Sequence, residues 1–192
     1  GIGYPPSIIY RLGVVHLAYN DTYYSIDSTI DVFYINSHDE GVTWSEPVIL
    51  SFPEEQHGQW PEIDADDSGN VAVCWMDYIG SPYDWTGGIW CRISNDYGST
   101  WNEPIRLEND YKGRAGTDVV INNNYVAVVW IGTAIEQSLY YRESYDGGQT
   151  WGDIQIVSHG QTNPTDLLYP AKSIKYNNYI HMVWSKKEAN RC

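Results

Sequence analysis

An eight-residue pattern occurs three times in this 192-residue sequence and constrains the fold more than any other feature. The pattern is Ser-x-Asp-x-Gly-x-Thr-Trp, and its copies begin at residues 37, 94 and 144. Five fixed positions recurring at similar intervals predict a protein built from repeated units. The residues that fit the pattern are Ser37, Asp39, Gly41, Thr43, Trp44, Ser94, Asp96, Gly98, Thr100, Trp101, Ser144, Asp146, Gly148, Thr150 and Trp151.

A second repeated unit lies upstream of the eight-residue pattern. It consists of two segments rich in Val, Ile, Tyr and Trp with a short turn between them. Pro61 to Trp75 and Pro170 to Trp184 are two copies of equal length. These compositions predict strands joined by tight turns. In the second repeat the expected strands cover residues 61–66, 71–77, 88–94 and 103–108. Four antiparallel strands in a repeat of this length are typical of a propeller blade.

We therefore predict an all-β fold, a β-propeller with four-stranded antiparallel blades. The sequence holds about three and a half blades of one partial propeller: 1–50, 51–108, 109–157 and the partial blade 158–192. Closed propellers have four to eight blades. We expect the chain to be a segment of a longer ring, in which further blades cover the open ends, with self-association as the alternative.

The composition of the sequence argues against some classes of binding partner. There are 25 acidic residues against 11 Lys and Arg, for a net charge of −14, which argues against nucleic acid as a partner. No apolar run approaches the length that spans a bilayer, so we expect no membrane insertion. The 17 Tyr and 9 Trp suit half-buried strands and surfaces on which sugars stack.

The three turns resemble the Asp-box of the sialidase superfamily, also called the bacterial neuraminidase repeat (BNR), and the resemblance covers essentially the whole chain. It implies a six-bladed ring and an extracellular or cell-surface protein. It also implies that the Asp-boxes are structural and lie away from the ligand face, which is formed by loops at the opposite ends of the strands. Each box has one carboxylate, whereas calcium takes six to eight oxygens, so we expect no metal and no cofactor.

The loops that the resemblance places at the ligand face cover residues 54–60, 109–116, 158–169, 20–29, 77–88 and 131–138. Aromatic, acidic and amide side chains in them suit a sugar site, and the alternative is that the exposed aromatic residues only cap blade edges. The glycan-binding candidates are His57, Gln59, Trp60, Tyr83, Asp84, Trp85, Tyr111, Arg114, Asp166 and Tyr169.

Catalysis is a separate question, and no catalytic residue is assigned. Active sialidases use three arginines, a Tyr nucleophile assisted by Glu, and an Asp acid/base, and their Arg-Ile-Pro motif is absent from this sequence. Only Arg114 stands in a predicted ligand-face loop, whereas Arg92 and Arg142 precede boxes. We predict a glycan-recognising module without complete catalytic machinery in this chain. The alternatives are an exo-sialidase or related glycoside hydrolase, and a structural propeller that docks proteins.

Two of the three cysteines, Cys74 and Cys91, are expected to face one another in the second blade. The equivalent pairs in the neighbouring repeats are Ala18 with Tyr34 and Val129 with Tyr141, so the position is interior. Free cysteine there behaves as a small apolar residue. We expect two neighbouring buried thiols, with a cross-strand disulfide as the alternative if the two residues lie directly opposite.

Overall fold

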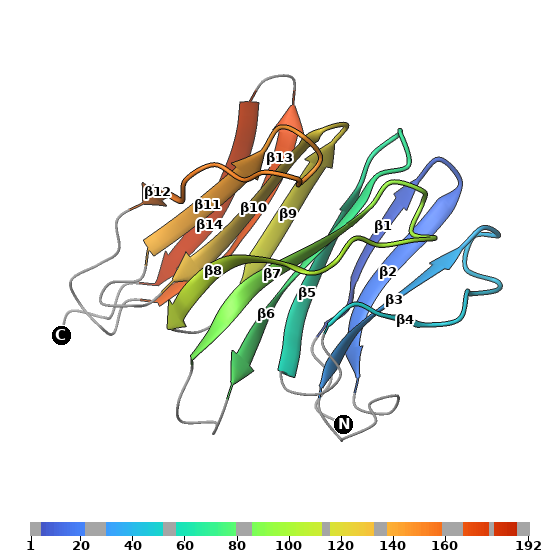
Figure 1. Ribbon diagram of the computed structural model, residues 1–192, viewed down its shortest axis with the longest axis horizontal. Coiled ribbons are helices and arrows are strands. Elements are labelled where there is room, and N and C mark those ends of the chain that lie inside the picture. Colours follow the sequence, from blue (N-terminus) through green and yellow to red (C-terminus); the bar gives the residue numbers. More distant parts are fainter. Residues whose placement is uncertain are drawn as a thin grey trace.

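The computed structural model describes residues 5–21, 30–51, 57–79, 86–112, 116–132, 138–158, 167–176 and 179–187. Within these ranges the regular structure is entirely β, in three four-stranded sheets and one two-stranded sheet, and every strand pairing is antiparallel (Figure 1). The predicted all-β architecture of four-stranded antiparallel blades is confirmed. No helix in the described part is long and apolar enough to cross a membrane.

The sheets follow the order of the chain, and we call them blades 1 to 4. Blade 1 contains β1 (Ser7–Arg11), β2 (Val14–Asp21), β3 (Asp31–Ser37) and β4 (Val48–Ile49). Blade 2 contains β5 (His57–Ala65), β6 (Val71–Ile79), β7 (Thr86–Ser94) and β8 (Ile105–Lys112). Blade 3 contains β9 (Thr117–Asn122), β10 (Tyr125–Gly132), β11 (Ser138–Ser144) and β12 (Gln155–Ser158). Blade 4 contains β13 (Leu167–Tyr176) and β14 (Tyr179–Lys187).

Two strands begin earlier than the sequence predicts. β5 begins at His57 and not at Pro61, and β13 begins at Leu167 and not at Pro170. Each proline lies where the strand register shifts, between Gln59 and Glu62 or between Tyr169 and Lys172. Proline lacks the N–H that a regular ladder needs, and a bulge accommodates it without ending the strand.

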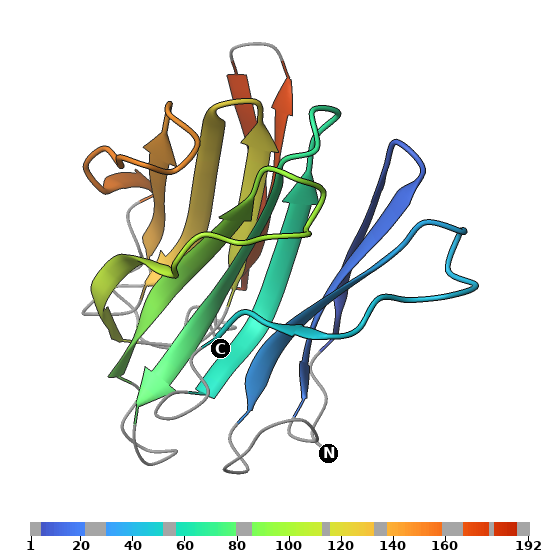
Figure 2. The same ribbon diagram turned by 45° about the vertical axis from the view of Figure 1, so that its right-hand side comes forward.

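The core lies between the blades, which stack face to face (Figure 2). Along β6, Cys74 and Met76 join the cluster shared with blade 3, whereas Val73 and Trp75 join the cluster shared with blade 1. Successive side chains of a strand point to opposite faces, and both faces of this sheet are covered. This explains why the strand is apolar throughout.

Side chains from the innermost strands also join neighbouring blades. Ser7 Oγ accepts a hydrogen bond from the backbone N–H of Ile63 (3.3 Å), and Asp64 accepts one from Ile121 (2.9 Å). Asp118 accepts one from the N–H of Ser173. The inner strands β1, β5, β9 and β13 are edge strands of their sheets, so these side chains satisfy donors that no neighbouring strand pairs.

The three repeated turns share one set of hydrogen bonds. In the second turn, Asp96 accepts from the Ser94 hydroxyl (2.7 Å), the Thr100 hydroxyl (2.6 Å) and the Thr100 N–H (2.8 Å). The same bonds occur around Asp39 and Asp146. Bonds from the threonine hydroxyl and N–H lower the pKa of Asp39 and of Asp146 to about 2, because they favour the ionised form.

Cys74 and Cys91 face one another across β6 and β7, as predicted, and the register places them directly opposite, which is the arrangement that the alternative of a cross-strand disulfide requires. Both thiols are buried and free. The equivalent pairs Ala18–Tyr34 and Val129–Tyr141 also lie opposite one another.

Candidate functional site

The two ends of the blades differ. The second and third turns lie against the hairpin tips of their own blades: the Tyr97 N–H donates to the carbonyl of Gly69 (2.8 Å), and the Gly147 N–H donates to that of Asn124 (2.7 Å). Strands β5, β9 and β13 start at the opposite end, where β6 and β10 finish. The candidate site extends from this opposite end along the inner strands.

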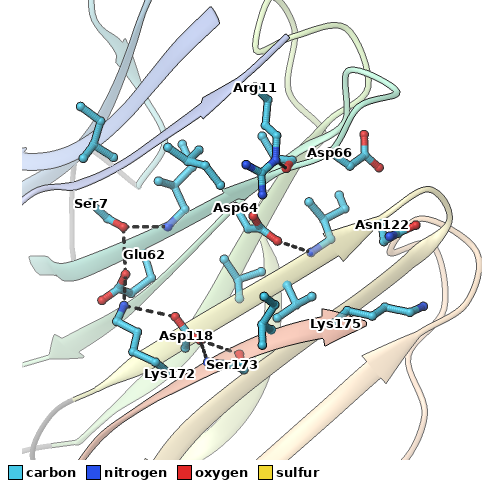
Figure 3. Close-up of a pocket in the computed structure, with 18 of the residues that line it drawn as sticks. Ser7, Arg11, Glu62, Asp64, Asp66, Asp118, Asn122, Lys172, Ser173 and Lys175 are labelled. Atoms are coloured by element: carbon cyan, nitrogen blue, oxygen red, sulfur yellow. Dashed lines mark hydrogen bonds and ion pairs between the residues drawn. The ribbon is translucent and has the colours of Figure 1, made fainter. Parts of the chain in front are cut away.

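Four inner strands line a cavity of about 580 Å³ (Figure 3). Ser7, Glu62, Asp118 and Lys172 occupy the same position in the four blades, since each pairs with the equivalent residue of its second strand. Their side chains converge. The Lys172 ammonium lies 2.6 Å from Glu62 Oε2 and 3.2 Å from Asp118 Oδ1, and the Ser7 hydroxyl donates to Glu62 Oε2 at 2.8 Å. We call Ser7, Glu62, Asp118 and Lys172 the inner cluster.

The inner cluster has a defined charge pattern. Burial raises the pKa of Asp118, against the opposing effects of the Ser173 hydroxyl and the Lys172 ammonium. Burial lowers the pKa of Lys172, but the bond to Glu62 and the charge of Asp118 outweigh it and leave that pKa above its usual value. The ammonium is therefore held charged between two carboxyl groups from two other blades. The Lys172 side chain is still 65% exposed, so a ligand entering the cavity can reach it.

Farther along the same cavity, toward the hairpin tips, the polar groups are used within the protein. Arg11 Nε donates to the carbonyl of Ala65 (2.9 Å), and Asp66 accepts from the N–H of Asn123 (2.5 Å). Burial raises the pKa of Asp64 to about 6, although its bond from the Ile121 N–H opposes this effect. The contacts of the inner cluster also join blades, but the 65% exposed Lys172 side chain leaves that cluster accessible to a ligand.

Two of the predicted glycan-binding residues are fully described, and both lie at the start of β5. Gln59 is 2% exposed, and its Oε1 is buried with no hydrogen-bond partner among the described residues. Trp60 has a φ of 48°, packs partly buried against the core shared by blades 2 and 3, and accepts a hydrogen bond from the Thr117 hydroxyl through its carbonyl (3.3 Å). Trp60 is therefore half-buried and does not project as an open platform.

The other predicted residues are described less fully. His57, Tyr111 and Tyr169 lie in strands β5, β8 and β13, and not in loops as predicted, while their side chains fall outside the described part. The strands are longer than the sequence indicates because β5 and β13 continue through bulges and β8 extends to Lys112. The remaining candidates lie outside the described residues: Tyr83, Asp84, Trp85, Arg114 and Asp166.

A second polar group lies where β6 finishes and β7 begins, and its residues are not among the predicted glycan-binding candidates. Asp77 is 1% exposed and accepts hydrogen bonds from the Gly88 N–H and from the Trp90 indole N–H (2.6 Å). The Arg106 guanidinium lies 5.5 Å from the Trp90 ring centroid. Burial raises the pKa of Asp77 while these bonds oppose the rise. The signal in the sequence was the position of Asp77 and Gly88 in the loop 77–88, which the resemblance placed at the ligand face; the structure adds that a Cβ on Gly88 would lie 2.8 Å from Arg106 Nε.

Within the described part, no group of three or more His, Cys, Asp or Glu residues is arranged to hold a metal ion. The inner cluster combines two carboxylates, an ammonium and a hydroxyl. It can accept hydrogen bonds from several hydroxyl groups and can donate to an anionic or ether oxygen.

The sequence matches no protein-family model and no curated protein. Solved structures do match. A Penicillium chrysogenum α-L-arabinanase in complex with arabinobiose superposes with a TM-score of 0.66 and 15% identity, over 96% of this chain and 57% of that one. The Hadza microbial sialidase Hz136 superposes with a TM-score of 0.58 and 18% identity, over 88% of this chain and 39% of that one.

The fold is a sialidase-like β-propeller. A third structure, an ulvan lyase of polysaccharide lyase family PL25, gives a TM-score of 0.64 and 15% identity over 94% of this chain and 44% of its own. The chain therefore spans about two fifths to three fifths of the length of these three structures.

Proposed function

We propose that this propeller is a glycan-recognising module, and that the inner cluster is its binding site. The observation that carries the proposal is the convergence of Ser7, Glu62, Asp118 and Lys172 from four blades on one cavity. Sugars offer many hydroxyl groups, and binding sites meet them with a few well-placed polar side chains. The arabinanase, sialidase and lyase named above are proteins with this fold that act on carbohydrates, which supports the same class of ligand.

The proposal includes the predicted candidates at the same end of the blades. Gln59 Oε1 has no partner among the described residues, and a buried amide oxygen without a partner is costly. Because Gln59 is 2% exposed, a ligand hydroxyl reaches this oxygen only when the surrounding side chains move. We propose further that the three turns are Asp-boxes of the sialidase superfamily and that the protein acts outside the cell, as the resemblance to that superfamily implies. The identity of the sugar is left to experiment because one fold serves several chemistries.

A glycan array with the full chain tests this function, followed by affinity measurements on two matched variants. Lys172→Ala and Lys175→Ala remove the same charge from the same strand, but only Lys172 belongs to the inner cluster. We expect Lys172→Ala to weaken glycan binding at least tenfold and Lys175→Ala to leave it within twofold. Thermal unfolding of both variants checks that they are folded at the assay temperature. Absence of any glycan ligand, or equal affinities of the two variants, would refute the proposal.

The alternative function is that of a glycoside hydrolase, and the buried Asp118 and Asp77 with raised pKa values favour it to a limited extent. However, Asp118 uses one carboxylate oxygen on Lys172 and the other on Ser173, and Asp77 uses both on Gly88 and Trp90. Fluorogenic sialoside and arabinoside substrates test this alternative. Turnover that Asp118→Asn abolishes would support a hydrolase, whereas an empty glycan array would favour a propeller that docks proteins.

A further inference from the structure

The turns of blades 2 and 3 present equivalent backbone atoms to the blade before them. Tyr97 and Gly147 occupy the same place in the two turns, between the Asp and the Gly of the pattern. Both have a left-handed φ, of 60° and 71°, and both donate their N–H to the hairpin tip of their own blade. Because the backbones agree, the carbonyl groups of Tyr97 and Gly147 face equivalent parts of the preceding blade.

At the interface between blades 1 and 2, this carbonyl group has two donors. The Tyr97 carbonyl accepts hydrogen bonds from the Tyr34 hydroxyl (3.2 Å) and from Asn36 Nδ2 (3.3 Å). Tyr34 lies so close to the turn that a Cβ on Gly98 would overlap its hydroxyl. Side chains of blade 1 therefore satisfy the carbonyl group and pack against the turn.

At the interface between blades 2 and 3, both donors are replaced. Cys91 occupies the position of Tyr34, and Ile93 occupies that of Asn36, three residues and one residue before the serine of the turn. Among the described residues, none donates a hydrogen bond to the Gly147 carbonyl. A groove of about 610 Å³ lies here, and Ile93 and Gly147 both line it.

The lining of this groove is rich in amide side chains. Ile93 and Ile105 contribute apolar surface, and Glu103 and Asp146 contribute the only ionisable side chains among the described residues that line it. The amide side chains are those of Asn70, Asn95, Asn102, Asn124 and Gln149. We call this groove the amide groove. It shares no lining residue with the cavity that contains the inner cluster.

Three of the five amide side chains are not used within the described part of the protein. Asn70 donates to a carboxylate of its own hairpin (2.9 Å), and Asn102 accepts from a backbone N–H of β7 (2.7 Å). The side chains of Asn95, Asn124 and Gln149 form no hydrogen bond with the described residues. These three amides are therefore available to a ligand.

Two of these available amides stand at positions that the turn does not need. Asn95 follows the serine of the second turn, where the first turn has His38. Gln149 precedes the threonine of the third turn, where the first turn has Val42. The hydrogen bonds that the three turns share use the Ser, Asp and Thr of the pattern, so Asn95 and Gln149 can bind a ligand without disturbing the turn.

We propose that the amide groove is a second saccharide-binding site, and that it takes a neutral sugar. An amide group both donates and accepts hydrogen bonds, as a sugar hydroxyl does, and the apolar surface of Ile93 and Ile105 suits the C–H face of a sugar ring. A sugar hydroxyl donates to the Gly147 carbonyl, in the place of the Tyr34 hydroxyl at the other interface. The carboxyl groups of Glu103 and Asp146 disfavour an anionic sugar.

Titration of the full ¹⁵N-labelled chain, followed by NMR, tests this site directly, because side-chain amide groups give their own signals. The probes are three neutral trisaccharides, arabinotriose, cellotriose and maltotriose, with trigalacturonic acid as the anionic comparison. We expect at least one neutral trisaccharide to shift the side-chain amide signals of Asn95 and Gln149 to saturation. Trigalacturonic acid at the same concentration should leave these signals in place.

Two variants that remove the same side chain locate the binding. Gln149→Ala removes an amide from the amide groove, whereas Gln155→Ala removes one from an exposed position on β12 that does not line it. We expect Gln149→Ala to weaken binding of the neutral trisaccharide at least fivefold and Gln155→Ala to leave it within twofold. The dispersion of the backbone signals shows whether each variant is folded.

Four results would each overturn the proposal. They are the absence of shifts with all three neutral trisaccharides, equal weakening by the two variants, binding of trigalacturonic acid as tight as that of the neutral sugar, and shifts confined to the inner cluster. The last result would leave the proposed function intact, since the inner cluster and the amide groove give separate signals.

Discussion

Glycine is required at position 98 for two reasons: the backbone conformation of its own turn, and the close approach of a side chain from the neighbouring blade. Its φ of +85° lies in the left-handed region, where a side chain is strained. The atom it would strike belongs to Tyr34, which is 1% exposed, and whose hydroxyl lies 2.6 Å from His16 Nδ1 and donates to the Tyr97 carbonyl. The ring is therefore held in place. Gly147 has a φ of +71° but nothing within 4 Å of its Cβ position, so it meets the first requirement alone.

Alanine substitutions at these two glycines separate the requirements. We expect Gly147→Ala to reduce the free energy of unfolding by about 1 kcal/mol, the cost of a left-handed alanine. Gly98→Ala should cost about 2–4 kcal/mol, because overpacking against Tyr34 adds to that strain. Urea denaturation at constant pH measures both. Equal losses would show that the neighbouring blade yields to the added methyl group.

At the scale of elements, the pairing of β6 with β7 determines the surroundings, and so the reactivity, of two cysteine side chains. Its alternation places Cys74 in the core shared with blade 3, and its pairing with β7 brings Cys91 directly opposite. Burial raises the pKa of Cys91 to about 12 and raises that of Cys74 well above its usual value. Thiolates react and thiols do not, so both cysteines should be inert in the folded protein.

Thiol titration without reductant tests the state of this pair. We expect three reactive thiols per chain in denaturant, the number of cysteines in the sequence. In the native protein at pH 8, Cys74 and Cys91 should react only as fast as the protein unfolds. A single reactive thiol in denaturant would mean that the two form a cross-strand disulfide, and Cys74→Ala would then leave two.

At the scale of the whole molecule, stability depends on contacts that cross from blade to blade. Arg142 donates from Nε to the carbonyl of Gly152 in its own blade (2.7 Å) and from Nη1 to that of Leu107 in blade 2 (3.0 Å). The planar guanidinium presents several donors in a fixed fork, which suits it to connect two carbonyl groups. Arg92 makes the same connection between blades 1 and 2.

We expect Arg142→Ala to lower the free energy of unfolding by about 2–3 kcal/mol. Two charge-assisted hydrogen bonds are lost, and the Leu107 carbonyl loses its donor from blade 3 at the interface between blades 2 and 3. Arg142→Lys should recover less than half of this loss, since one ammonium lacks the fork that spans both carbonyls. Chemical denaturation of the three proteins measures the difference. If lysine recovers the full loss, the positive charge, and not the forked geometry of the guanidinium, stabilises the interface between blades 2 and 3.

Local information in the sequence was sufficient for the blades. The turn pattern recurs with glycine and aspartate at the positions that need them, and segments rich in Val, Ile, Tyr and Trp mark the strands, so the four-stranded units and the Cys74–Cys91 pairing could be predicted. These features depend on residues close in the chain or on one hairpin register. The loop candidates Tyr83, Asp84, Trp85, Arg114 and Asp166 remain predictions, because they lie outside the described residues.

Only the tertiary structure brought the inner cluster together. Glu62, Asp118 and Lys172 are separated by more than 50 residues from one another, and no local pattern distinguishes them from other charged residues on strands. They meet because stacking of the blades aligns equivalent positions of the inner strands, and the bulges at Pro61 and Pro170 set which side chains face the cavity. Turns and strands are properties of short segments, whereas a binding site depends on how those segments pack against one another in space.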